Sequence, residues 1–222
     1  MNIILASASK RRQKLLSWLI KDFEIKPSQI NETAFAKLAR NPEELVVKLS
    51  LAKAKAGGEK VPNSIIIAAD TIVAIADTSQ VLPSATVINE TWQIIGKPKD
   101  KAEIAQTLSF LSGKTHQVYT GLCVLQSTSS HFGTDFELSH MTFKNLSKKF
   151  IDKWSAQEFL LDHAGSYSIQ DMKDELFDTI EGSYTSVVGL PLAKTADFLE
   201  QFGVVLQSAW QDKVLQETGY KD

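Results

Sequence analysis

The chain is poor in the features that mark disulfide-stapled or membrane-bound proteins. Its 222 residues include a single cysteine, Cys123, so no disulfide can form within the chain. Because Cys123 lies in an apolar run, we expect a buried strand residue there and not a catalytic thiol. No window approaches the ~20 apolar residues that a membrane helix needs, and the N-terminus lacks the pattern of a secretory signal. We therefore expect a soluble, cytoplasmic protein.

Charge and histidine spacing argue against two further classes of protein. Twenty-four basic and twenty-six acidic residues give a net charge of −2, so there is no general basic field to attract nucleic acid. The histidines are scattered without the short spacings of zinc sites; they are His116, His131, His140 and His163. Any anion site must be local and any metal oxygen-ligated, and neither nucleic acid nor a membrane is an expected partner.

The chain is long enough, at 43% hydrophobic residues, to bury a full core in one domain or in two small lobes that share a cleft. Strand-like apolar runs alternate with amphipathic helical segments, which is typical of an α/β or α+β fold. We expect one domain over residues 1–206 and a peripheral tail at 207–222. Strands are expected at 3–6, 23–25, 65–75, 116–125 and 132–143, a hairpin with a long surface loop at 77–98, and helices after 10, 41, 100 and 191.

The N-terminal segment joins an apolar strand to small residues and three consecutive cations, Leu5-Ala6-Ser7-Ala8-Ser9-Lys10-Arg11-Arg12. Ser9 is a natural N-cap, and the first turn of a helix leaves unpaired N–H groups and a partial positive charge. Small residues let a phosphate approach these groups, and Arg11 can hold phosphate oxygens with two hydrogen bonds. The segment predicts an anion site, with a solvated basic helix face as the alternative.

An acid stands in the middle of the most apolar strand, where Asp70 interrupts residues 65–75. A buried carboxylate is costly unless it is paired, hydrogen-bonded or bound to a metal. Either the strand ends near Ala69 and Asp70 is exposed or caps a turn, or Asp70 is functional. Glu32, in a polar loop, is a candidate partner because two oxygen ligands from separate segments suit Mg²⁺; alternatively it is a solvated loop acid.

Three more polar residues are weak candidates when taken singly. Lys53 falls in the last turns of a predicted helix, and Lys97 stands between a glycine and a proline. The spacing of a P-loop is absent, so Lys97 is not a P-loop lysine. The amide of Gln170 could pair with a base edge. For each of these residues an ordinary solvent-exposed side chain is the alternative.

Short segments that carry these candidates stand in a specific order along residues 3–202: 5–12 with 15–16, 31–32, 51–56, 69–73, 96–98, 111–116, 119–121, 164–170, and 181–184 with 187–191. This order resembles the Maf family of nucleoside triphosphate pyrophosphatases. The resemblance implies an α/β fold of the inosine triphosphatase-like kind, with a curved mixed sheet, flanking helices and two lobes around a nucleotide cleft. It further implies hydrolysis of a nucleoside triphosphate between the α and β phosphates, with Mg²⁺ or Mn²⁺ as cofactor.

The resemblance also implies roles for individual residues. Asp70 matches the catalytic base and, with Glu32, the metal ligands. Charge on the triphosphate would be neutralised by cations, and the substrate-binding positions are Ser9, Arg11, Arg12, Lys53, Thr71, Lys97 and Gln170. Of these, Arg11, Thr71 and Gln170 match positions that the family uses to select its substrate.

Within the family, residues 70–71, 169–170 and 182–184 look like the branch that prefers dTTP, UTP and modified pyrimidine triphosphates. Two alternatives stay open: the branch that acts on 7-methyl-GTP, and a nucleotide-binding regulator of septum formation with little catalysis. Members of the family are often homodimers, and Trp154 or Trp210 could serve such a contact.

Three departures from the family pattern stand out. Lys10 replaces a usual proline, the connection at 78–91 is longer than usual, and 171–173 replaces a glycine-rich turn after Gln170.

Overall fold

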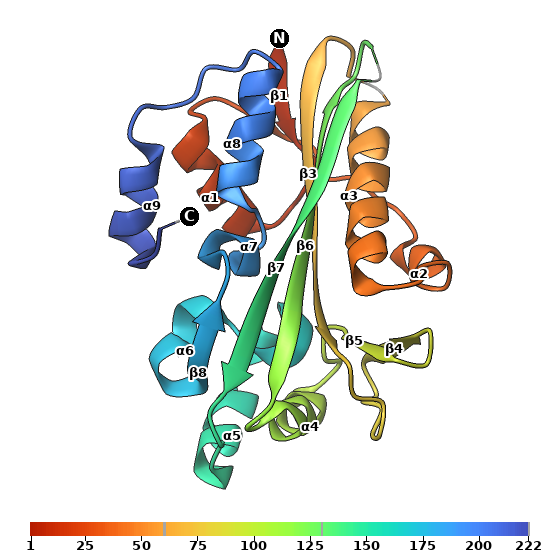
Figure 1. The fold of residues 1–222 in the computed structure, drawn as a ribbon, viewed down its shortest axis with the longest axis vertical. Helices are drawn as coiled ribbons and strands as arrows, with labels where there is room; N and C mark the ends of the chain where they lie inside the picture. Colours follow the sequence, from red (N-terminus) through yellow and green to blue (C-terminus); the bar gives the residue numbers. More distant parts are fainter. Residues whose placement is uncertain (60, 130, 222) are drawn as a thin grey trace.

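The computed structural model describes residues 1–59, 61–129 and 131–221, which form one mixed sheet with helices around it (Figure 1). The strands follow the order β2-β1-β3-β6-β7-β8, and β5 pairs with both β3 and β4. Their bounds are β1 (Asn2–Leu5), β2 (Glu24–Ile25), β3 (Ser64–Ile75), β4 (Ala85–Ile88), β5 (Trp92–Ile95), β6 (Thr115–Gln126), β7 (Phe132–Phe143) and β8 (Phe177–Glu181). The expected mixed α/β fold is confirmed.

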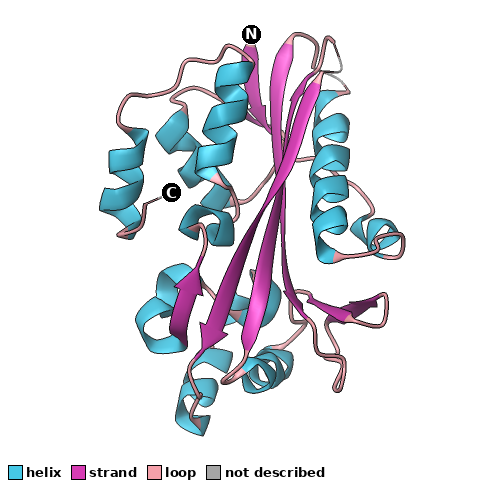
Figure 2. Ribbon diagram, viewed as in Figure 1, coloured by secondary structure: helices cyan, strands magenta, loops and turns pink. Residues whose placement is uncertain are grey.

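Helices lie on both sides of the long strands (Figure 2). One side carries α2 (Glu32–Ala36) and α3 (Pro42–Gly58), and the other carries α1 (Lys10–Leu19), α7 (Tyr184–Val188), α8 (Leu192–Gln201) and α9 (Trp210–Thr218). Near the end of the sheet where β6 begins lie α4 (Lys101–Leu111), α5 (Lys148–Ser155), η1 (Glu158–Asp162), η2 (Ala164–Ser166) and α6 (Ile169–Leu176). In the described part of the chain, no helix is both long and apolar enough to cross a membrane.

Local capping explains where the main helices begin. The side chain of Asn41 accepts a hydrogen bond from the backbone N–H of Glu44, with Pro42 at the first position of α3. Asp100 and Glu103 form a capping box at the start of α4. Asp100 accepts a hydrogen bond from the backbone N–H of Glu103, and the side chain of Glu103 accepts one from the backbone N–H of Lys99.

Strand β3 is buried on both faces, which explains its nearly continuous apolar sequence. Its odd-numbered residues, such as Ile67 and Val73, pack into the core beneath α1, α4 and α8. Its even-numbered residues, such as Ala68 and Ile72, pack against α3 and the β4–β5 hairpin. By this alternation Asp70 belongs to the side of α3, and Thr71 to the side of α1.

One edge of β3 changes its partner half-way along. Residues 64–67 pair in parallel with β1, and residues 73–75 pair in antiparallel with β5. On the opposite edge, β6 pairs with β3 from residue 65 to residue 74 without interruption. Residues 68–72, all of them described, therefore have no strand partner on the first edge, and Asp70 lies at the centre of this gap.

The structure corrects several local predictions. Glu32 is the first residue of the short helix α2, capped by Asn31, and not a loop residue. Residues 165–170, whose sequence favours a loop or the entry to a strand, form the end of the turn η2 (Ala164–Ser166) and the start of α6. The expected hairpin at 77–98 is confirmed, but its connection is partly packed, since Leu82 and Ile88 are buried.

The tail from residue 207 packs on the body of the protein, within the residues described. Val214 in α9 is fully buried, and the ring of Tyr220 stacks on Tyr184 of α7 at 5.0 Å between centroids. Cys123 is buried in β6, as predicted. Trp154 is buried as well, so it cannot form an exposed dimer contact.

Candidate active site

A cleft of about 870 Å³ opens over the gap in the edge of β3. Its walls come from the β1–α1 loop, the starts of α1 and α2, one face of α3, the β5–α4 loop, the η1–α6 segment and the end of α7. All the site residues that the sequence predicts line it: Ser9, Arg11, Arg12, Glu32, Lys53, Asp70, Thr71, Lys97 and Gln170. Segments far apart in the sequence, from Ser9 to Gln170, therefore meet at one place, because β3 runs along the floor of the cleft and pairs with strands in both halves of the sheet.

Asp70 and Glu32 meet at a single cation. The ammonium of Lys53, on the cleft-facing side of α3, contacts Oδ1 of Asp70 and lies 2.7 Å from Oε1 of Glu32. Asp70 is only 6% exposed, whereas the Glu32 side chain is largely open to solvent. The two carboxylates thus converge from β3 and α2 on a position that a positive charge already fills.

Burial controls the protonation of Asp70. Removal from water raises the pKa of its carboxyl, and the nearby charges of Lys53 and Arg12 act in the opposite direction. A raised pKa makes a carboxylate a better proton acceptor.

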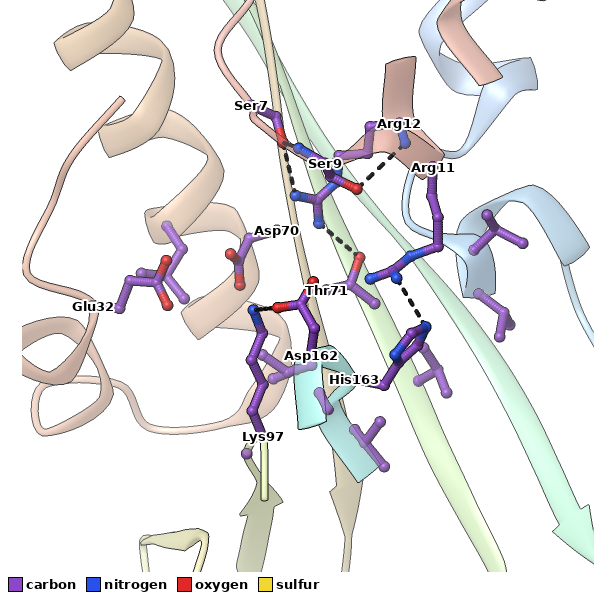
Figure 3. A pocket seen from close by; sticks show the side chains of 18 of the residues that line it. Ser7, Ser9, Arg11, Arg12, Glu32, Asp70, Thr71, Lys97, Asp162 and His163 are labelled. Atoms are coloured by element: carbon purple, nitrogen blue, oxygen red, sulfur yellow. Dashed lines mark hydrogen bonds and ion pairs between the residues drawn. The ribbon is translucent and has the colours of Figure 1, made fainter. Parts of the chain in front are cut away.

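Arg12 is fixed by the protein itself. Its Nε donates to the carbonyl oxygen of Gly189 at 2.7 Å, and its two terminal nitrogens donate to Ser7 Oγ at 3.3 Å and Thr71 Oγ1 at 3.1 Å (Figure 3). Burial is the main reason that the pKa of this guanidinium is lowered. Arg12 therefore stands as a fixed positive charge whose field reaches Asp70.

The other two predicted cations are held by consecutive residues of one loop. Arg11 Nη1 lies 2.8 Å from Nε2 of His163, and Lys97 Nζ lies 2.5 Å from Oδ1 of Asp162. The hydrogen bond from Lys97 is the main reason that the pKa of Asp162 is lowered. Figure 3 shows both pairs, with Arg11 and His163 on the side of the view away from Glu32 and with Lys97 and Asp162 between them and Glu32.

The remaining predicted residues lie at the rim and floor. Ser9 caps α1 by accepting from the N–H of Arg12 at 3.4 Å. Thr71 Oγ1 also lies 3.0 Å from Thr120 Oγ1, which ties it to β6. Gln170 is exposed in the first turn of α6.

A family model described as Maf-like protein matches residues 2–202. The chain belongs to the Maf-like family. A dTTP/UTP pyrophosphatase of Desulforamulus reducens is 37% identical over 202 residues, covering 91% of this chain and 97% of that protein. Proteins of the same name from Bacillus mycoides and Bacillus cytotoxicus are 38% and 39% identical, covering 90% of this chain and 95% and 94% of their own. A solved HAM1 protein from Coxiella burnetii is 15% identical, with a TM-score of 0.47 over 90% of this chain and 99% of its own.

The Maf-like cleft offers oxygen donors that fit a hard divalent cation. Asp70 and Glu32 already hold one positive charge between them, so a metal ion could replace the ammonium of Lys53 there. Nowhere in the described residues do three or more His, Cys, Asp or Glu side chains gather as a metal site. Two carboxylates suit Mg²⁺ or Mn²⁺, which keep water ligands and bind substrate phosphates.

Two Maf-like cleft residues were missed from the sequence, Asp162 and His163. Both stand directly before the segment 164–170, and that adjacency was the available signal. The hairpin also contributes to the cleft, since Thr86 of β4 lines it.

Proposed function

We propose that this Maf-like protein hydrolyses dTTP, UTP and modified pyrimidine triphosphates to the nucleoside monophosphate and pyrophosphate. The observation that carries the proposal is the buried carboxylate of Asp70 beside Lys53, in a cleft whose walls present Arg11 and Lys97. A triphosphate needs several cations for its charge and one proton acceptor at the reacting bond. The names of the relatives support the substrate class.

In the proposed reaction, a water oxygen forms a bond to the α-phosphorus as the bond from that phosphorus to the α–β bridging oxygen breaks. Asp70 accepts a proton from the attacking water, and its raised pKa suits that task. Pyrophosphate leaves with the bridging oxygen. Lys97 and Arg11 would neutralise charge that the β and γ phosphates already carry in the bound triphosphate, while Arg12 stabilises the negative charge that develops at the α-phosphate.

Lys53 has two tasks in this scheme. Without substrate it compensates the charges of Asp70 and Glu32. With substrate and metal bound, its flexible stem would let the ammonium turn from the carboxylates to a phosphate oxygen. Asp70 and Glu32 would then hold Mg²⁺ or Mn²⁺, which supplies charge neutralisation and a more acidic bound water.

Base selection is assigned to the positions that the family uses for it, Arg11, Thr71 and Gln170. Thr71 is fixed by hydrogen bonds with Arg12 and Thr120, so it presents a rigid hydroxyl. Gln170 is exposed on the rim, where its amide can reach a base edge. The single buried cysteine fits a reducing compartment, and we place the activity in the cytoplasm.

The test is pyrophosphate release from a panel of triphosphates with Mg²⁺ or Mn²⁺: dTTP, UTP, 5-methyl-UTP, ITP and 7-methyl-GTP. We expect turnover of the pyrimidine set, loss of turnover with chelator, and a loss of about 10³-fold or more in Asp70→Asn. Asp152→Asn, which changes an exposed acid on α5, is the matched control and should keep full activity.

Two results would contradict the proposal. Turnover of 7-methyl-GTP alone would assign the protein to the other branch of the family. Tight UTP binding with no pyrophosphate release from any substrate would instead indicate a nucleotide-binding regulator.

A further inference from the structure

The ring of His163 has a defined protonation state. Its Nε2 lies 2.8 Å from Nη1 of Arg11, and its Nδ1 lies 2.9 Å from the carbonyl oxygen of Phe159 (Figure 3 shows the first contact). A guanidinium can only donate and a carbonyl can only accept. Nδ1 must therefore carry the hydrogen and Nε2 must accept, so the contacts require a neutral ring in the Nδ1–H tautomer.

The contact with His163 orients Arg11 but leaves most of its donors available for a ligand. A guanidinium has five N–H donors, and within the described residues the Arg11 side chain donates one hydrogen bond, to His163. Arg12 differs, because all three of its side-chain nitrogens donate to protein oxygens. Arg11 therefore keeps most of its fork for phosphate oxygens, on a long side chain that would otherwise sample many rotamers.

The surroundings of His163 favour the neutral ring at neutral pH. Arg11 from α1 faces Nε2 of the ring. Asp162, the preceding residue in the chain, is paired with Lys97, and Asp171 of α6 acts on the ring through its charge. Burial and then Arg11 lower the pKa of His163 from its ordinary 6.5, and the two aspartates act in the opposite direction. Protonation would put a hydrogen on Nε2, facing a donor, and a second positive charge beside Arg11.

We propose that neutral His163 is a positioning residue that aims Arg11 at the substrate phosphates, and that protonation of His163 releases Arg11 and weakens substrate binding. This inference rests on the proposed function, because it assigns His163 to the same cleft. His163 acts through Arg11, so its effect falls on KM and leaves kcat nearly unchanged.

The test compares wild type, His163→Gln and His163→Ala in UTP hydrolysis from about pH 5 to about pH 8.5. The Oε1 of glutamine can accept from Arg11 much as Nε2 does, but it does not titrate. Near pH 8 we expect the KM and kcat of His163→Gln to lie within about twofold of the wild-type values. For His163→Ala we expect KM to rise about tenfold and kcat to change less than about threefold.

The pH profile separates His163 from other titrating groups. As the pH falls below about 6.5, the KM of wild type should rise relative to that of His163→Gln by up to about tenfold. The substrate phosphate and Asp70 titrate in both proteins, so the ratio of the two KM values isolates His163. A ratio that stays constant across the range would overturn the proposal, as would a normal KM with a collapsed kcat in His163→Ala.

A second measurement needs no turnover. Binding of α,β-imido-UTP, which resists cleavage, is followed by calorimetry at the same pH values, and the tautomer of His163 is read from its ¹⁵N chemical shifts. We expect the Nδ1–H form near neutral pH, and the same pH-dependent change in the ratio of the wild-type and His163→Gln binding constants. The Nε2–H form would refute the proposal.

If no triphosphate is hydrolysed, the proposed function fails while these binding data still decide the role of His163. If His163→Ala does not fold, wild type and His163→Gln provide the same comparison.

Discussion

Gly121 on β6 lies directly across the ladder from Asp70 on β3, beneath the backbone of α3. A Cβ added at this glycine would stand 2.2 Å from the carbonyl oxygen of Val46 and 2.4 Å from its carbonyl carbon. Non-bonded contacts need about 3.5 Å, so Gly121→Ala must push α3 away from the sheet by about 1 Å. Since Lys53 is carried on α3, this change should move it relative to Asp70.

The expected cost follows from that displacement. Overpacking of a core typically costs about 1–3 kcal/mol, and a clash with helix backbone belongs at the upper end. For a domain of this size that corresponds to a fall of about 5–10 °C in Tm. Misplacing a catalytic group by about 1 Å should lower kcat/KM for UTP by about 10²-fold.

The assay is urea or thermal unfolding together with pyrophosphate release. Gly58→Ala is the matched control in the same helix, because the nearest atoms to its Cβ would be side-chain atoms, those of Ile66 and Leu125 at 3.4 Å and of Ser127 at 3.8 Å. It should not lower the stability, because alanine is favoured over glycine in a helix by up to about 1 kcal/mol. If Gly121→Ala retained wild-type stability and a kcat/KM for UTP within about twofold of wild type, the close approach of α3 to the sheet would not be what positions Lys53 beside Asp70.

Three further predictions concern charge and burial. Lys53→Met should leave Asp70 without its compensating cation, raise the pKa of that carboxyl further and lower kcat/KM by about 10²-fold or more, which a pH–rate profile measures; an unshifted profile would contradict this. Asp77, whose pKa is lowered to about 2 by hydrogen bonds from Lys114 and Ser79, should stabilise the fold above its ordinary pKa of 3.8. The difference in unfolding free energy between wild type and Asp77→Asn, about 0.5–1 kcal/mol, should therefore vanish as pH falls from 3.8 towards 2. Burial raises the pKa of the Cys123 thiol to about 12, so it should react with Ellman's reagent at pH ~8 only after denaturation, and fast labelling of native protein would refute its burial.

Sequence reasoning succeeded where a residue's own context carried the signal. The position of Asp70 inside an apolar strand indicated a carboxylate with a functional role, and the order of motifs indicated which residues would gather around it. The apolar spacing of Ile169, Met172 and Leu176 was available too, and would have predicted α6 in place of a loop. The five-residue helix at Glu32 is too short for periodicity to reveal.

The rest of the site depends on contacts between distant segments. His163 meets Arg11 across 152 residues, and Asp162 meets Lys97 across 65. No local pattern encodes such a pair, since either residue alone resembles a solvated surface group. The change of partner along one edge of β3 is likewise a property of the assembled sheet, and it decides where the cleft opens.

That change of partner has a consequence for association between chains. An open strand edge normally offers its N–H and C=O groups to any other strand, and so promotes aggregation. The open edge of β3 spans only residues 68–72 and ends at β1 on one side and β5 on the other. A foreign strand would have to fit within this short stretch, beside the charge of Asp70 and beneath Arg12. The interruption is therefore too short for the extended peptide that would start a fibril.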